Sequence, residues 1–135
     1  MDPAKLGFSS ARKGQRVSNS DAKYVEVVHA DPSYLGYHSN IGTADFYLNG
    51  FSKQPGCGFW ENIIGCSHKR AYRYFAESIN DSTVGFWGDK CNDWSELVEK
   101  NCKGERGIMG GPKSQTLPAG IYYVKTNSKS PFAMG

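Results

Sequence analysis

Three segments of the chain have hydrophobic patterns that predict β-strands. Residues 23–30 are rich in β-branched side chains, which predicts a strand buried on most of its surface, and the Asp31-Pro32 pair predicts its end. Residues 44–48 predict a second strand, which closes at Asn49-Gly50. After a Gly-rich stretch, residues 120–126 predict the last strand.

One amphipathic helix is predicted after Ser67. Ser67 is the expected N-cap, which places His68 in the first turn. The following residues recur at the spacing of one helix face that packs on a core: Ala71, Tyr74, Phe75, Ser78 and Ile79. Because strands and a helix alternate along the chain, the predicted class is α/β.

Length and composition restrict the kind of protein. A chain of 135 residues forms one small domain at most. Its net charge of +3 is weak and dispersed, so we expect no nucleic-acid partner. No apolar run is long enough for a transmembrane segment, and residues 1–20 lack the hydrophobic stretch of a signal peptide.

The cysteines form two close pairs along the sequence. Eight residues separate Cys57 from Cys66 and ten separate Cys91 from Cys102, whereas metal ligands usually lie only two to four residues apart. We therefore predict two local disulfides, Cys57–Cys66 and Cys91–Cys102, although four cysteines allow three connectivities that counting alone does not distinguish. Disulfides imply an oxidising compartment, and the sequon at residues 80–82 favours the same conclusion.

Several segments together resemble the animal pancreatic-lipase family. The resemblance covers nearly the whole chain and is strongest for the insect lipases and sn-1-specific phospholipases, which end without a C-terminal lipid-binding β-sandwich. It rests on Asp2-Pro3-Ala4, residues 20–31, Ile41-Gly42, residues 45–51 and 54–57, residues 66–71 and 77–79, Met109-Gly110, residues 122–127 and Pro131-Phe132.

The resemblance implies the C-terminal part of an α/β-hydrolase fold over residues 1–135, with an incomplete sheet. In that fold the catalytic residues follow the order Ser, Asp or Glu, His, with the serine in a Gly-x-Ser-x-Gly turn. The resemblance assigns the aspartate to Asp2 and the histidine to His68, so the serine is expected before residue 1. The segment Gly7-Phe8-Ser9-Ser10-Ala11 ends in alanine and follows the aspartate, so it does not supply the serine. We therefore expect the nucleophile and a signal peptide in a missing N-terminal part, and this chain to be inactive alone.

Each candidate catalytic residue also has a purely structural interpretation. His68 could be an ordinary histidine of a first helical turn, but the positive helix terminus disfavours imidazolium and suits a base. Asp2 could belong to a disordered end or cap a turn before Pro3, whereas the family role is to hold the imidazole tautomer. For His29 and Asp31 we prefer a structural pair in a turn, and His38 is expected to be an exposed loop residue.

Four large apolar residues lie between Cys57 and Cys66, where a solvated loop would carry polar ones. They are Phe59, Trp60, Ile63 and Ile64. A small hairpin packing its own side chains is one interpretation. The resemblance instead implies a disulfide-closed lid that meets the lipid surface. Its shortness favours phospholipid over triacylglycerol as the substrate.

No metal or other cofactor is predicted. Vertebrate members of the family hold a calcium ion in the loop after the aspartate. Here that loop retains Arg16 and Asp21, but Ser18 stands where relatives carry aspartate, and a single carboxylate is a poor calcium site.

Two functions remain at this stage. The first is a secreted, extracellular serine ester hydrolase that acts on phospholipid (phospholipase A1 type) or acylglycerol, with lipid as its partner. The alternative is a non-catalytic lipid-binding or yolk-protein-like relative. Retention of both Asp2 and His68 favours the enzyme, because degenerate relatives tend to lose a member of the triad.

Overall fold

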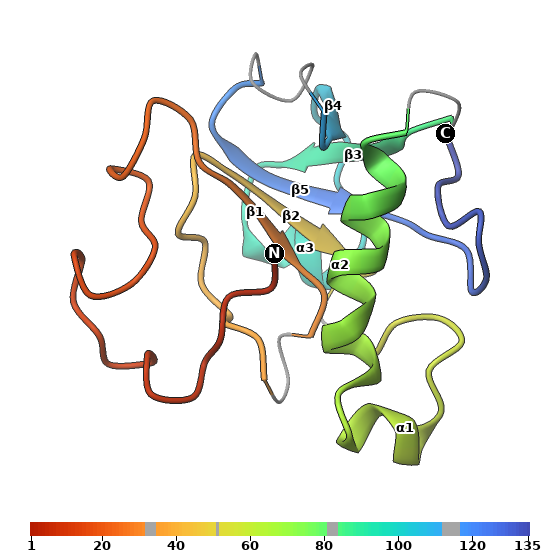
Figure 1. The fold of residues 1–135 in the computed structure, drawn as a ribbon. Helices are drawn as coiled ribbons and strands as arrows, with labels where there is room; N and C mark the ends of the chain where they lie inside the picture. The colour runs from red at the N-terminus through yellow and green to blue at the C-terminus, as the bar shows by residue number, and fades with distance from the viewer. Residues whose placement is uncertain (32–34, 51, 81–83, 112–116) are drawn as a thin grey trace.

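A five-stranded mixed sheet forms the centre of the computed structural model, in the order β1-β2-β5-β3-β4 (Figure 1). The structure describes residues 1–31, 35–50, 52–80, 84–111 and 117–135. Pro32, expected to end the first strand, and Asp81 and Ser82 of the sequon lie outside the described residues. The strands are β1 (Glu26–His29), β2 (Ala44–Leu48), β3 (Phe86–Cys91), β4 (Arg106–Met109) and β5 (Gly120–Val124).

The sheet combines a parallel half and an antiparallel half. Strand β2 lies between β1 and β5 and is parallel to both, with Phe46 opposite Val28 on one side and Tyr122 on the other. Strand β3 is antiparallel to both β5 and β4. All five residues of β2 are buried, as expected for a central strand covered on both faces. The sheet and its helices support the predicted α/β class.

Helices cover both faces of the sheet. Helix α2 (Cys66–Ser78) packs Ala71 and Tyr74 against a core that includes Phe46 and Tyr122. On the opposite face, Leu97 of the short helix α3 (Trp94–Glu99) packs with Tyr47 and the Cys91–Cys102 disulfide. The chain therefore has three layers, and the first turn of α2 lies near the carboxyl end of β1 (Figure 1).

The start of the long helix differs from the prediction. Its N-cap is Gly65 rather than Ser67, and Gly65 has a φ of 86°, in the left-handed region that glycine tolerates best. Ser67 lies inside the helix and is buried, with its hydroxyl bonded to Asn62. At the other end, Ile79 is the C-cap and is exposed, so it does not extend the apolar face as predicted.

The strand boundaries match the prediction best in the middle of the sheet. Strand β2 has the predicted bounds, but β1 begins at Glu26 rather than Lys23 and β5 ends at Val124 rather than Thr126. The short helix α1 (Phe59–Ile63), helix α3 and strands β3 and β4 were not predicted. Within the described parts of the chain, no helix has the length and apolar character needed to span a bilayer.

Candidate active site

Asp2 and His68, 66 residues apart in sequence, are in direct contact. Nδ1 of His68 lies 2.6 Å from Oδ2 of Asp2. Because an ionised carboxylate only accepts hydrogen bonds, Nδ1 carries the proton, and Nε2 is left with a lone pair. The Asp2 side chain is 1% exposed and the His68 side chain 37%, so the carboxylate of the pair is buried and the imidazole is accessible.

The end of β1 orients the Asp2 carboxylate. Its Oδ1 accepts hydrogen bonds from the backbone N–H groups of Ala30 (2.9 Å) and Asp31 (3.2 Å). The backbone N–H of Asp2 also donates to the carbonyl of Val28. Gly36 also lies close to this oxygen, since an added Cβ would overlap the Asp31 carbonyl and lie 2.6 Å from Oδ1. The carboxylate is therefore fixed on both oxygens before any substrate arrives.

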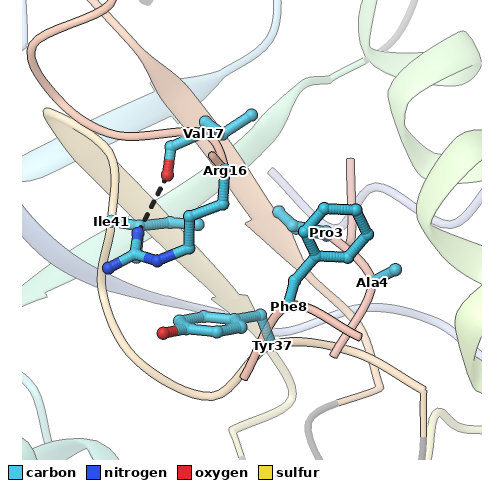
Figure 2. A pocket seen from close by; sticks show the side chains of 7 residues that line it. All are labelled: Pro3, Ala4, Phe8, Arg16, Val17, Tyr37 and Ile41. Carbon is cyan, nitrogen blue, oxygen red and sulfur yellow. Dashed lines mark hydrogen bonds between the residues drawn. The ribbon is translucent and has the colours of Figure 1, made fainter. Parts of the chain in front are cut away.

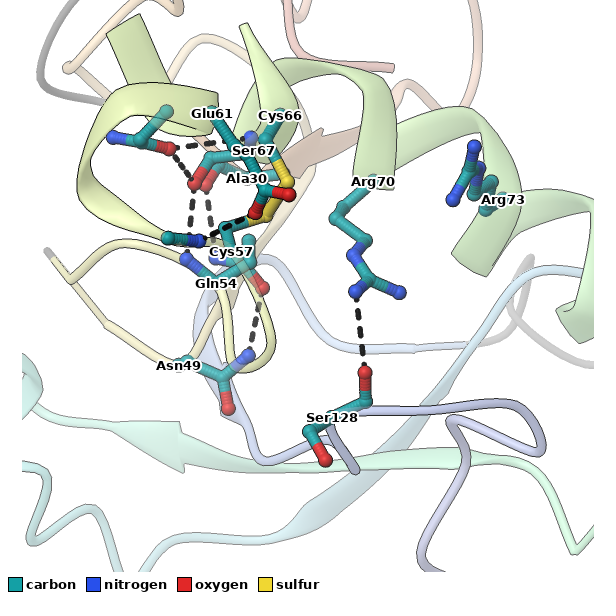
Figure 3. The surroundings of a disulfide bond; sticks show 12 residues. Ala30, Asn49, Gln54, Cys57, Glu61, Cys66, Ser67, Arg70, Arg73 and Ser128 are labelled. Carbon is teal, nitrogen blue, oxygen red and sulfur yellow. Dashed lines mark hydrogen bonds between the residues drawn. A yellow bond between two sulfur atoms is a disulfide. The ribbon is translucent and has the colours of Figure 1, made fainter.

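A buried glutamine links the surroundings of Asp2 to those of His68. Gln54 is fully buried, and its Nε2 donates to the carbonyls of Ala30 (2.8 Å) and Leu48 (2.7 Å). Its backbone N–H donates to the hydroxyl of Ser67, the residue before His68 (3.0 Å) (Figure 3). No role for Gln54 was predicted from the sequence, since nothing in the local pattern distinguishes a buried glutamine from an exposed one.

His29 belongs to a separate buried pair. Its Nε2 lies 2.8 Å from Oδ1 of Asp45, and its ring stacks on Tyr47 with centroids 4.2 Å apart. The expected structural role fits this geometry, but the partner is Asp45 on the neighbouring strand rather than Asp31. The other ring nitrogen, Nδ1, lies 2.9 Å from the carbonyl of Tyr37. Both nitrogens are thus occupied, and His29 has no free atom for catalysis.

His38 is exposed, as expected for a loop residue. Partial burial and the nearby Lys5 ammonium, whose Nζ lies 3.3 Å from Nε2, lower the pKa of its imidazole.

The apolar segment between Cys57 and Cys66 projects into solvent. The two cysteines are disulfide-bonded, and the segment between them contains α1. Trp60 is 78% exposed and Ile64 71% exposed, and Phe59 and Ile63 are also exposed. Phe59 and Trp60 touch edge to face, with ring centroids 5.3 Å apart, but this contact covers little of either ring. These four side chains therefore form an apolar tip that nothing in the described chain covers.

A pocket of about 200 Å³ opens beside the residues that follow Asp2 (Figure 2). The Arg16 guanidinium lies over the Tyr37 ring, 5.1 Å from its centroid. The pocket is mainly apolar and is lined by Pro3, Ala4, Phe8, Arg16, Val17, Tyr37 and Ile41.

The loop compared above with a calcium site is held by its own hydrogen bonds. The Asp21 carboxylate accepts from the backbone N–H of Ser18 (2.9 Å) and from its hydroxyl (3.0 Å). Among the residues that the structure describes, no group of three or more His, Cys, Asp or Glu side chains could hold a metal ion.

Comparison with known proteins places the chain in one family. A family model described as Lipase matches residues 1–132. Phospholipase A1 2 of Vespa affinis is 37% identical over 135 residues, which cover 98% of this chain and 39% of that protein. Pancreatic lipase-related protein 2 of Rattus norvegicus is 32% identical over 123 residues, which cover 76% of this chain and 26% of that protein. The chain thus spans well under half the length of these relatives, and it belongs to the lipase family.

Proposed function

We propose that the protein carrying this chain is a serine ester hydrolase that releases a fatty acid from phospholipid, with His68 as its general base and Asp2 as the residue that orients His68. The observation that carries the proposal is the Asp2–His68 hydrogen bond of 2.6 Å, together with the accessible ring. Among the described residues, no hydrogen-bond partner occupies Nε2 of His68, so it is available to a serine hydroxyl.

The proposed mechanism uses each feature of the pair. His68 Nε2 takes the proton of the attacking serine, and the Asp2 carboxylate stabilises the imidazolium that forms. The serine oxygen bonds to the ester carbonyl carbon, and the imidazolium then protonates the departing alcohol to leave an acyl-enzyme. Water repeats the sequence with His68 as base and releases the fatty acid.

The serine and the oxyanion donors are proposed to come from an N-terminal part of the protein that this chain does not include. The coverage of 39% to 43% of the full-length Vespa relatives supports this proposal. We further propose that the protein is secreted, which two disulfides support.

Phospholipid is preferred to triacylglycerol for two reasons. Relatives that are 37% identical are named phospholipase A1, and the segment between Cys57 and Cys66 contains only eight residues. A non-catalytic role is disfavoured because a lipid-storage protein has no need of a buried acid paired with an accessible imidazole.

The experiment compares variants of the full-length natural protein on phosphatidylcholine vesicles. His68→Ala should lower kcat by about 10⁴- to 10⁶-fold and Asp2→Asn by about 10⁴-fold, on the scale known for triad members. His38→Ala is the matched control, and we expect it to retain nearly full turnover. Equal losses in the His68 and His38 variants at matched folded fraction would refute the assignment.

A further inference from the structure

A second pocket lies on α2, away from the Asp2–His68 pair. Its volume is about 300 Å³, and it is lined by Gly56, Glu61, Ile64, Cys66, Lys69, Arg70 and Arg73. The four residues from α2 recur at the spacing of one helix face. His68 is rotated about 200° from Cys66 at 100° per residue, which places it near the opposite side of the helix. A ligand in this pocket is therefore not the ester held by His68.

Three positively charged side chains line this pocket against one negative one. Lys69, Arg70 and Arg73 contribute three positive charges, and the Glu61 carboxylate contributes one negative charge, which leaves a net charge of +2. Glu61 is already engaged at the start of α1, since its Oε2 accepts the backbone N–H of Gly58 at 2.7 Å. Within the described residues, none of the three cations forms an ion pair with a carboxylate.

Arg70 is the most buried of the three cations. It is only 8% exposed, its guanidinium lies over the Phe132 ring, and its Nη2 donates to the Ser128 carbonyl at 3.1 Å (Figure 3). Its Nε is buried and has no hydrogen-bond partner among the residues that the structure describes. A buried, unpaired donor on a charged group is costly, and an anionic oxygen would satisfy it.

The apolar tip adjoins this pocket. Ile64 lines the pocket and is also 71% exposed, and Phe59, Trp60 and Ile63 lie beside it in the same disulfide-closed segment. Cations next to exposed apolar side chains match the chemistry of a lipid surface, where phosphates lie just above the acyl chains. A soluble phosphate would use the cations but would leave the apolar neighbours uncovered.

We propose that Lys69, Arg70 and Arg73 bind the phosphate of an anionic lipid in the bilayer while the apolar tip enters the interface. The site is a second lipid-binding site, which holds the protein on an anionic surface and leaves the Asp2–His68 pair free for substrate. The proposal rests on the proposed function only in assuming that the protein acts at a lipid surface.

The test measures binding of the full-length natural protein to vesicles of ether-linked lipids, which contain no ester bond to hydrolyse. Ether-linked phosphatidylcholine alone is compared with the same lipid mixed with ether-linked phosphatidylglycerol. Lys69→Gln/Arg73→Gln removes two exposed charges, and Arg70 stays unchanged because it also packs on Phe132. The matched control, Lys13→Gln/Lys103→Gln, removes two exposed charges elsewhere.

We expect the anionic vesicles to bind more tightly, and Lys69→Gln/Arg73→Gln to weaken that binding about 30-fold. The control should weaken it no more than about 3-fold, because a phosphate bound in this pocket interacts mainly with the charges that line it and only weakly with the net charge of the protein. Equal losses in the two variants, or no preference for anionic vesicles, would overturn the proposal.

Calorimetric titration with inorganic phosphate should show no binding, and phosphate binding that disappears in Lys69→Gln/Arg73→Gln would assign the pocket to a soluble anion instead. A protein that binds the vesicles but hydrolyses no ester would refute the proposed function and leave this site intact.

Discussion

At the scale of single residues, both oxygens of the Asp2 carboxylate have assigned partners. One oxygen accepts from the backbone at the end of β1, and the other accepts from His68. Asp2 itself has a φ of 40°, in the left-handed region that aspartate visits more readily than most residues. The position of the Asp2 carboxylate therefore depends on a few close neighbours.

Gly36→Ala should test that dependence. The added methyl group would overlap the Asp31 carbonyl and lie 2.6 Å from the Asp2 carboxylate, so the backbone at Asp31 or Gly36 must move, and the carboxylate with it. We expect kcat to fall by at least 10-fold, since small misplacements of catalytic groups have large effects. The resonance of the His68 Nδ1 proton, which is donated to Asp2, should also shift in the proton NMR spectrum. Full activity with an unchanged NMR signal would show that the carboxylate tolerates displacement.

His29→Gln should act on stability rather than on turnover. Asp45 would lose the imidazole that lies 2.8 Å from its Oδ1 in a fully buried site, and among the described residues it would retain the backbone donors of Ile41 and Gly42. Breaking a buried pair on one side typically costs about 3–5 kcal/mol of unfolding free energy. Urea denaturation measures this loss, and kcat per folded molecule should change less than about 10-fold. A kcat as low as that of His68→Ala would show that the two histidines had been assigned to the wrong roles.

At the scale of elements, the hydrophobic pattern of the sequence predicted best the segments that are buried along their whole length. Strand β2 has five buried residues and was predicted with its correct bounds, because all its residues except Asp45 are apolar or aromatic and Asn49-Gly50 marks its end. Strand β3 was missed because Gly88 and charged residues interrupt it. Gly88 is needed there, since a Cβ would lie 2.8 Å from a Val124 methyl group, a tertiary contact that the local sequence does not reveal.

The candidate site was only partly predictable from the sequence. Asp2 and His68 came from a resemblance in sequence, and their order along the chain placed them in named roles. The polar network around Gln54 depends on carbonyls from two different strands and on the start of α2. Such a network exists only after folding, so no periodicity in the sequence signals it.

The Cys57–Cys66 disulfide should affect activity as well as stability. Cys66 is the first residue of α2 and lies two residues before His68. Removing either disulfide as a Cys→Ser pair should reduce the unfolding free energy by about 2–3 kcal/mol, through the loss of loop closure. Only Cys57→Ser/Cys66→Ser should also reduce kcat at matched folded fraction, since Cys91→Ser/Cys102→Ser lies on the other face of the sheet. Equal effects of both pairs on kcat would argue against a link between the loop and the site.

At the scale of the whole molecule, the core contains several buried phenols. Tyr47, Tyr74 and Tyr122 are among the largest fully buried side chains. Burial raises the pKa of each, and the Asp45 carboxylate raises the pKa of Tyr47 further. The folded protein therefore favours the neutral phenol more strongly than the unfolded chain does.

This difference predicts a loss of stability in alkaline solution. In the unfolded chain these tyrosines ionise near pH 10, whereas in the folded chain they stay protonated at higher pH. Stability is complete below about pH 10 and should then fall by roughly 1.4 kcal/mol per pH unit for each buried phenol. Urea midpoints measured from pH 9 to pH 11 test this, and Tyr47→Phe should make the decline less steep. An identical slope in Tyr47→Phe would mean that other groups cause the alkaline loss.

The disulfide-closed loop between Cys57 and Cys66 also limits how deeply the protein can enter a bilayer. A closed ring of ten residues extends at most about 17 Å from its disulfide, because half of its residues must lead out and half must lead back. A bilayer with its headgroup regions is about 40 Å thick, so each leaflet is about 20 Å thick, more than the loop can span. The apolar tip can therefore touch only the leaflet that faces the protein. Lipid packing and composition in that one leaflet should govern attachment, and the far leaflet should have no influence.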